Sequence, residues 1–373
     1  MLTCSRCNQT YPETEPRWRC ECGACLLLQS DRMFTRDSLT ARPPTLWRYR
    51  EALAVERGDC VVSLGEGFTP LVADELFGRP VLLKLDFLNP TGSFKDRGSA
   101  VMISKLKEWG IPEIVEDSSG NAGASVAAYA RRAGITAHIY VPGYTSAGKT
   151  AQIRMYGADL VKVDGSREDT TRAAVEAASR TFYASHNWSP YFVAGLKTMA
   201  YEICEQQSWQ APDWVVAPVG GGSLVLGLYL GFTDLLKAGL ISRMPRIAAV
   251  QAAACAPVYH AWRQRLHDVP AVAKRESAAE GIVIAQPVKG GAILEAIYNS
   301  DGVVLTVTEE EIWATARALA EKGIYVEPTA AAAPAAVRQM AEQGLAGPES
   351  SVVVPLTGMG LKATDKFLEH LGL

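Results

Sequence analysis

The chain lacks the features that direct a protein to a membrane or across one. No apolar run among its 373 residues is long enough to cross a bilayer without an interruption by Gly, Pro or a charged residue. The N-terminus has no positively charged region followed by an apolar stretch, which argues against a secretory signal. We therefore expect a cytoplasmic protein with no membrane partner.

A basic excess is also missing. Lys and Arg number 37 against 40 Asp and Glu, and the net charge is -3. Binding to nucleic acid depends on clustered positive charge, so we expect no nucleic-acid partner. The chain has 48% hydrophobic and 21% charged residues, which is typical of a globular enzyme with a sizeable core and two domains.

Cysteine is scarce along most of the chain but concentrated at its start. Five of the eight cysteines lie within the first 25 residues, namely Cys4, Cys7, Cys20, Cys22 and Cys25. In a cytosolic chain such clustering indicates a metal site before disulfides. The pair Cys4 and Cys7, with two of the other three, would supply four thiolates to a structural zinc. It stays open whether these two are Cys22 and Cys25 or Cys20 and Cys22, and a reduced arm without metal is the alternative.

The most informative run extends from Asn89 to Gly98 and reads NPTGSFKDRG. The apolar run from Val81 to Phe87 predicts a strand before it, and Ser99 to Trp109 has the spacing of an amphipathic helix. Lys95 is therefore expected at a helix N-terminus. The positive end of the helix dipole favours the neutral amine there, which can attack an aldehyde. A surface lysine in a polar turn is the alternative.

A glycine-rich turn follows another predicted strand, from Val215 to Val219. Its sequence, Gly220-Gly221-Gly222-Ser223-Leu224, opens a helical pattern. Backbone N–H groups at such a helix start can converge on a phosphate. The turn matches neither the dinucleotide-binding glycine pattern nor a P-loop, so a flexible turn is the alternative.

Two further polar turns follow predicted strands. Ser118-Ser119-Gly120-Asn121-Ala122 precedes an alanine-rich helix and offers N–H groups that suit a carboxylate, although a simple N-cap at Asn121 is the alternative. Thr357 follows the apolar strand from Val352 to Pro355, where an ordinary Thr turn is the alternative.

Short apolar runs alternate with helix-length segments along the rest of the chain. They lie at 113–115, 137–141, 160–163, 215–219, 247–250, 303–305 and 352–354. This alternation of strand and helix patterns predicts an α/β fold of parallel sheets with helices on both faces.

The order of the Lys95 run, the Asn121 loop, the Gly220 loop and Thr357 resembles that of pyridoxal-phosphate (PLP) enzymes of fold type II, the tryptophan synthase β-like fold. The resemblance is to threonine synthases in particular, and it extends from the cysteine arm to Lys362. Smaller matches lie at 63–71, 281–287 and 326–330.

The resemblance implies two doubly wound parallel-sheet domains and a zinc-ribbon-like arm. The arm would span 1–30, and a small domain at 98–187 would be inserted into a large PLP domain made of 31–97 and 188–373. A homodimer is expected on the same ground.

The resemblance also implies that Lys95 holds pyridoxal 5'-phosphate as a Schiff base, with Phe94 against the cofactor ring. Asn121 would donate a hydrogen bond to the phenolic oxygen of the cofactor. The loop from Ser118 to Ala122 would hold the carboxylate of the substrate.

The remaining cofactor contacts would come from the Gly220 to Leu224 loop, at the phosphate, and from Thr357, at the pyridine nitrogen. A neutral hydroxyl cannot keep that nitrogen protonated as a carboxylate would, so the ring is a weaker electron sink. This favours elimination over transamination or racemisation.

The stretch from 185 to 198, SHNWSPYFVAGLKT, departs from the family pattern. Threonine synthases bind the phosphate of O-phosphohomoserine, and in many of them an arginine does so at the position that here is Phe192. Losing a guanidinium removes charge-assisted hydrogen bonds worth roughly 1.5–3 kcal/mol each. Trp188, Tyr191 and Phe192 then predict a less charged, more aromatic pocket. The alternative is that this segment is misaligned by a few residues or packs in the core.

We therefore expect a threonine synthase-like lyase in which Lys95 removes the α-proton of a small amino acid before β/γ-elimination or replacement. His186 and Asn187 are the expected substrate contacts, and Phe192 argues against O-phosphohomoserine. The alternatives are a serine/threonine dehydratase-type ammonia-lyase and a β-replacement synthase. An alternative of another class is a non-catalytic zinc-ribbon interaction protein on the same scaffold.

Overall fold

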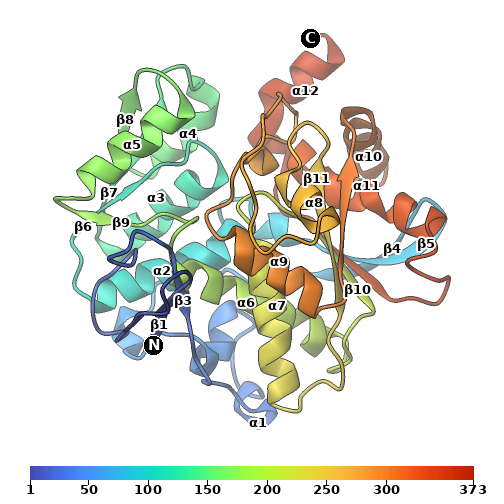
Figure 1. The fold of residues 1–373 in the computed structure, drawn as a ribbon, viewed down its shortest axis with the longest axis horizontal. Coiled ribbons are helices and arrows are strands. Elements are labelled where there is room, and N and C mark those ends of the chain that lie inside the picture. The colour runs from blue at the N-terminus through green and yellow to red at the C-terminus, as the bar shows by residue number, and fades with distance from the viewer. The chain divides into compact units, whose positions relative to one another are not determined.

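The computed structural model describes all residues from 1 to 373, which form two compact units (Figure 1). One unit comprises 1–67 and 89–196, and the other comprises 68–88 and 197–373. These limits differ from the predicted domain boundaries, because the first 67 residues and the Lys95 run belong to the same unit as 98–187. None of the helices combines the length and the apolarity that a bilayer crossing requires.

The first unit contains a four-stranded parallel sheet with the strand order β8-β7-β6-β9. Its strands are β6 (Glu113–Glu116), β7 (Thr136–Pro142), β8 (Asp159–Val163) and β9 (Phe182–Tyr183). Its helices are α2 (Lys95–Glu108), α3 (Asn121–Ala133), α4 (Ala147–Met155) and α5 (Arg167–Ala177). Both α3 and α5 pack on β7, and α2 packs along α3.

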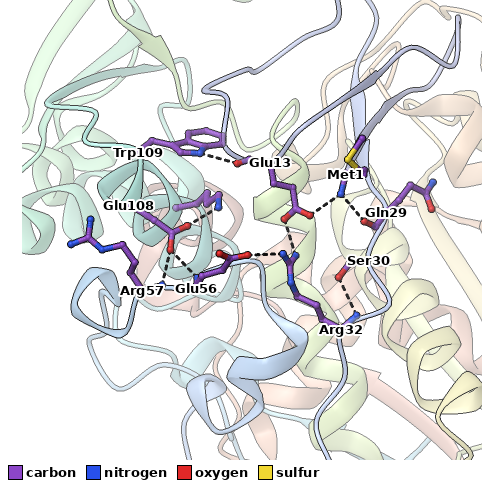
Figure 2. A network of polar contacts seen from close by, with 10 residues as sticks. Met1, Glu13, Gln29, Ser30, Arg32, Glu56, Arg57, Glu108 and Trp109 are labelled. Carbon is purple, nitrogen blue, oxygen red and sulfur yellow. Dashed lines mark hydrogen bonds and ion pairs between the residues drawn. The ribbon is translucent and has the colours of Figure 1, made fainter.

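The N-terminal arm of this unit forms three short antiparallel strands, β1 (Leu2–Cys4), β2 (Thr10–Tyr11) and β3 (Leu26–Leu28). Figure 2 shows the contacts that fasten the arm to the unit. Arg32 bridges Glu13 at 2.8 Å and Glu56 at 2.9 Å, and Nε1 of Trp109, the C-cap residue of α2, donates to the carbonyl of Glu13. The chain continues through α1 (Arg36–Leu39), η1 (Leu46–Ala52) and η2 (Gly58–Cys60).

The second unit contains a six-stranded sheet with the order β12-β11-β10-β13-β5-β4. All neighbours are parallel except β4 and β5. The strands are β4 (Leu71–Leu76), β5 (Arg79–Lys84), β10 (Trp214–Pro218), β11 (Arg246–Ala252), β12 (Val303–Val307) and β13 (Val352–Pro355). Every residue of β10 and β13 is buried, as expected for central parallel strands covered on both faces.

The remaining helices belong to this unit, apart from α6, which begins in the first unit and ends in the second. They are η3 (Asp86–Leu88), α6 (Pro190–Gln206), α7 (Ser223–Lys237), α8 (Pro257–Arg263), η4 (Glu280–Ile282), α9 (Gly290–Asn299), α10 (Glu309–Glu321), α11 (Pro328–Glu342), η5 (Gly360–Ala363) and α12 (Thr364–Leu371). A fully buried ion pair of 2.7 Å between Lys84 and Glu202 joins β5 to α6.

All the predicted strands are present, and the predicted parallel sheets are confirmed. The largest differences in boundaries are two: the run from Val81 to Phe87 is a strand only as far as Lys84, and the amphipathic helix expected over 99–109 extends back to Lys95, the residue expected at a helix N-terminus. The sequence did not predict β4 or β9. β4 is an edge strand with exposed residues on both faces, and β9 has only two residues, so neither produces an apolar run.

Candidate active site

Lys95 is the first residue of α2, as the sequence predicted. A tight turn leads into the helix, in which the Gly92 N–H donates to the carbonyl of Asn89 at 2.8 Å and Gly92 has a φ of 85°. The Lys95 ammonium lies 4.6 Å from the ring centre of Phe94 and 5.8 Å from that of Phe192. The lysine therefore projects from a glycine-dependent turn into aromatic surroundings.

Asp96, the next residue, anchors this turn. Its buried carboxylate accepts hydrogen bonds from the Thr91 backbone N–H, the Thr91 hydroxyl and the Ser125 hydroxyl of α3. Burial raises the pKa of Asp96 to about 6, although the hydrogen bonds from Ser125 and Thr91 oppose the rise. One side chain thus fixes both the Lys95 turn and the start of α2 against α3.

The matched segment at 63–71 supports the same turn through Glu66. This fully buried carboxylate accepts hydrogen bonds from Trp47 Nε1 at 2.9 Å, the Leu64 N–H at 2.7 Å and the Tyr129 hydroxyl at 2.8 Å. The adjacent Gly67 N–H donates to the side chain of Asn89. The segment therefore positions the first residue of the Lys95 run.

The loop from Ser118 to Ala122 joins β6 to α3, which begins at Asn121. Gly120 occupies the N-cap position, so Asn121 does not serve as the simple N-cap. A Cβ at Gly123 would lie 1.8 Å from the carbonyl oxygen of Ser118, so only glycine permits this close turn. Ser118, Ser119 and Asn121 are partly exposed, and they can reach a ligand at the helix N-terminus.

In the second unit, the loop from Gly220 to Leu224 joins β10 to α7. Gly222 is the N-cap of α7 and has a φ of 81°, where a Cβ would lie 2.1 Å from Ile293 Cδ1. A Cβ at Gly220 would lie 2.8 Å from the Cα of Ile282. The glycines therefore allow a close backbone turn at a helix N-terminus, as a phosphate loop requires.

Thr357 follows β13 in the same unit and is 1% exposed. Its Oγ1 has no hydrogen-bond partner within the chain. The matched segment at 326–330 supports this loop: the Glu327 N–H donates to the Gly358 carbonyl at 3.0 Å, and Thr329 Oγ1 accepts from the Gly281 N–H at 3.2 Å. Segments 281–287 and 326–330 thus assemble with the Gly220 and Thr357 loops.

These residues suit the chemical groups of PLP. A glycine loop at a helix N-terminus matches a phosphate, and the buried Oγ1 of Thr357 matches a pyridine nitrogen. The Oγ of Ser93, two residues before Lys95, is also buried without a partner. Buried hydroxyls are usually hydrogen-bonded, so both indicate a polar ligand.

The expected aromatic pocket is only partly present. Phe192 is fully buried beside Lys95, and its ring occupies the space that a Cβ at Gly98 would enter. Trp188 packs on Trp18 of the arm, and Tyr191 packs on Trp109, so for these two a place in the pocket stays a prediction. Residues 191 and 192 lie about 100° apart around α6, so one face cannot carry both.

Sequence reasoning missed Glu116 and Asp117, the acidic residues at the end of β6. Glu116 is fully buried, and its Oε1 lies 2.7 Å from Nδ1 of His186. Asp117 accepts hydrogen bonds from Tyr183 and Thr171 and pairs with Arg167. Charged residues directly before a polar loop, at the carboxyl end of a parallel strand, were the available signal. Asn187 is partly exposed next to His186.

In the arm, the Sγ atoms of Cys4, Cys7, Cys20 and Cys22 lie within 4.8 Å of one another. Cys25 is not part of this group, and its Sγ lies 3.1 Å from the hydroxyl of Ser5. The backbone N–H groups of Arg6 and Cys7 point at Cys4 Sγ, both at 3.4 Å. Of the two pairs left open, Cys20 and Cys22 are thus the ones whose Sγ atoms lie close to those of Cys4 and Cys7.

Comparison with known proteins agrees with these features. Residues 62–358 match the family described as "Pyridoxal-phosphate dependent enzyme". Threonine synthase of Methanocaldococcus jannaschii is 36% identical over 97% of this chain and 93% of that protein, and threonine synthase of Synechocystis is 38% identical over 87% and 84%. Among solved structures, the threonine deaminase of T.th. superposes with a TM-score of 0.66 at 26% identity, covering 78% of this chain and 92% of that one.

Both the family match and the relatives that cover almost the whole chain make it an enzyme, which removes the non-catalytic alternative. The parallel sheets and the solved structures that resemble them identify the fold as type II. The chain therefore belongs to the family of pyridoxal-phosphate-dependent enzymes, in which it is a threonine synthase-like lyase.

Proposed function

We propose that the enzyme forms threonine by eliminating a γ-substituent from a small amino acid and adding water at the β-carbon. The similarity to threonine synthases over almost the full chain carries this proposal. The retained Lys95 at the start of α2 supports it, because the reaction needs a base at the α-carbon.

When bound, PLP supplies an electron sink that stabilises negative charge at the α-carbon of the amino acid. Lys95 Nζ binds the cofactor and then accepts the α-proton of the substrate. The N–H groups of the loop from Ser118 to Ala122 hold the substrate carboxylate. Asn121 would hydrogen-bond the phenolic oxygen, and Phe94 would lie against the cofactor ring.

Further cofactor contacts are proposed for residues of the second unit. The N–H groups of the Gly220 to Leu224 loop hold the cofactor phosphate at the start of α7. The hydroxyl of Thr357, whose Oγ1 has no partner within the chain, would donate a hydrogen bond to the pyridine nitrogen. Because a hydroxyl does not protonate this nitrogen, Thr357 directs the enzyme toward elimination.

A second candidate is an ammonia-lyase that acts on an amino acid without a phosphate, such as serine or threonine. The fully buried Phe192 beside Lys95 favours it, since an apolar ring replaces the expected guanidinium. His186 and Asn187 are the proposed polar contacts to the substrate in both candidates.

A substrate panel separates the two. The enzyme is incubated with O-phosphohomoserine, L-serine and L-threonine, and phosphate, threonine, ammonia and 2-oxo acid are measured. Threonine and phosphate released in equal amounts from O-phosphohomoserine support the first proposal. Ammonia and 2-oxo acid from serine or threonine, without phosphate release, support the second.

The arm has a structural role in this proposal. The four clustered thiols of Cys4, Cys7, Cys20 and Cys22 would bind one zinc ion and leave no open position for a substrate. An arm this small has too little core to fold well without such a link.

A further inference from the structure

Glu116 and His186 form a buried hydrogen-bonded pair. A histidine that only contacts the substrate would not need a buried carboxyl group to hold its ring. Oε1 of Glu116 lies 2.7 Å from Nδ1 of His186, and the backbone N–H of His186 donates to Oε2 at 3.2 Å. Glu116 is fully buried, and His186 is 8% exposed. Both carboxylate oxygens contact the same residue, so the orientation of the imidazole is fixed. Nε2 is then the nitrogen that can exchange a proton with a group other than Glu116.

The surroundings of Glu116 favour its protonated form. Burial raises the pKa of Glu116 well above its usual value and the nearby Asp117 adds to the rise, whereas Arg167, the His186 N–H and Lys95 oppose it. Asp117 itself is held by Tyr183, Thr171 and Arg167. A carboxyl group that favours its protonated form can share an exchangeable proton with the imidazole of His186.

The pair also lies close to the catalytic lysine. The ring centre of Phe192 is 5.9 Å from that of His186 and 5.8 Å from Lys95 Nζ. Phe192 packs against Gly98, which follows Lys95 by one helical turn. Lys95 and His186 therefore border the same buried apolar ring within one compact unit.

The reaction needs a second proton transfer that Lys95 does not provide. Lys95 acts at the α-carbon, whereas water addition or hydroxyl loss takes place at the β-carbon. Water must lose a proton to become a good nucleophile, and a hydroxyl group must gain one to leave as water. A phosphate or chloride leaving group needs no such proton.

We propose that His186, oriented by Glu116, is a second acid–base residue that exchanges a proton with the oxygen atom at the β-carbon of the substrate. This inference rests on the proposed function. In water addition, the oxygen of water bonds to the β-carbon and one of its protons passes to Nε2 of His186. The electron pair of the double bond between the α- and β-carbons moves to the α-carbon, to which Lys95 returns a proton. In hydroxyl loss, the bond from the β-carbon to oxygen breaks with its electron pair on oxygen, and Nε2 supplies the proton that completes water.

The first test varies the leaving group on the PLP-loaded enzyme. His186→Gln is expected to lower kcat/KM for L-serine about 100-fold or more, the usual effect of losing a general acid. For β-chloro-L-alanine, whose chloride leaves unprotonated, the same variant should stay within about 5-fold of wild type. An equal loss for both substrates would mean a structural role and would overturn the inference.

The second test uses O-phosphohomoserine and compares products. In His186→Gln, phosphate release should persist while threonine per phosphate falls about 10-fold or more, with 2-oxobutanoate and ammonia making up the difference. Glu116→Gln, which acts through His186, should shift the ratio the same way and still fold. An unchanged ratio in both variants would overturn the inference.

A binding measurement gives a readout that does not depend on turnover. In a Lys95→Ala background, calorimetry compares L-threonine with L-2-aminobutyrate, which lacks the oxygen at the β-carbon. Adding His186→Gln is expected to reduce the preference for threonine about 10-fold. A preference that stays the same argues that His186 does not reach that oxygen.

The chain offers a matched control in His138, which pairs through Nε2 with Glu113 at the other end of β6 and is partly exposed. His138→Gln should leave the rates, the product ratio and the binding preference at wild-type values. If wild type turns over none of the hydroxyl or phosphate substrates, the proposed function fails and the inference fails with it. If wild type is active but His186→Gln matches it, only the inference fails.

Discussion

The hydroxyl of Ser125 donates a hydrogen bond to the carboxylate of Asp96 over 2.6 Å, and this contact joins the helix that starts at Lys95 to the helix that starts at Asn121. The same carboxylate holds Thr91 in the turn before Lys95. The starts of the two helices that carry the proposed cofactor contacts Lys95 and Asn121 are thus tied together through one buried acid.

Replacing Asp96 by Asn tests how this buried carboxyl group affects the free energy of unfolding as the pH changes. The pKa of Asp96 in the folded protein is about 6, above its usual 3.8. The carboxyl group of Asp96 therefore binds a proton more tightly in the folded protein than in the unfolded chain. Its contribution to the free energy of unfolding is complete below about pH 4 and is lost as the pH rises to about 6. The loss amounts to about 3 kcal/mol.

Thermal unfolding of wild type and Asp96→Asn between about pH 4 and pH 7 measures this effect. The melting temperature of wild type should fall relative to the variant as the pH rises through that range. Ser125→Ala removes a hydrogen bond that favours the charged form, so it should extend the fall to higher pH. Parallel pH profiles for wild type and Asp96→Asn would show that the acid is not titrating in the folded protein.

Lys95→Ala is expected to fold normally, because Lys95 is only the first residue of its helix. The variant should lose the near-visible absorption of the bound cofactor, and kcat should fall about 1000-fold or more without the base. Absorption spectra and steady-state rates measure both. Lys107→Ala, on the same helix, is the control and should keep both properties; sustained turnover in Lys95→Ala would reject Lys95 as the base.

Gly222→Ala tests the proposed phosphate loop. The new methyl group would meet Ile293 at 2.1 Å, at a φ of 81° that other residues rarely adopt. Such strain costs of order 1–3 kcal/mol, so we expect PLP affinity to fall about 10-fold or more. Equilibrium titration with PLP measures this affinity.

The control for this substitution is Gly239→Ala. Gly239 has a φ of 67°, but no atom lies within 4 Å of the position of a Cβ. It therefore carries the same backbone strain at the other end of α7 without the clash. Equal losses of PLP affinity in both variants would indicate general destabilisation instead of a local effect on the phosphate loop.

Zinc content distinguishes the cysteines of the arm. Cys20→Ser should lose the metal, because it removes one of four clustered thiols, while Cys25→Ser should keep about one zinc per chain. Mass spectrometry of the purified metal-loaded proteins measures this. Loss of zinc in Cys25→Ser with retention in Cys20→Ser would assign the site to the pair Cys22 and Cys25.

Local sequence was sufficient to predict the central strands and the helix starts at Lys95, Asn121 and Ser223, because glycine turns and apolar runs are short-range signals. Short-range signals could not predict the hydrogen-bond partners of Glu116 and Asp96. His186 lies 70 residues from Glu116, and Ser125 lies 29 from Asp96, so only the folded chain brings them together. The orientations of Trp188 and Tyr191 depend on packing against distant Trp18 and Trp109 in the same way.

The contact of Trp18 with Tyr183 also protects the sheet. Tyr183 belongs to β9, the edge strand next to β6, and the Trp18 ring meets the Tyr183 ring edge to face at 4.9 Å. An uncovered edge offers unpaired N–H and C=O groups to the strands of other molecules. The arm thereby guards this edge against intermolecular strand pairing, so a chain shortened by its first 30 residues would be prone to aggregate even with every cofactor-binding residue in place.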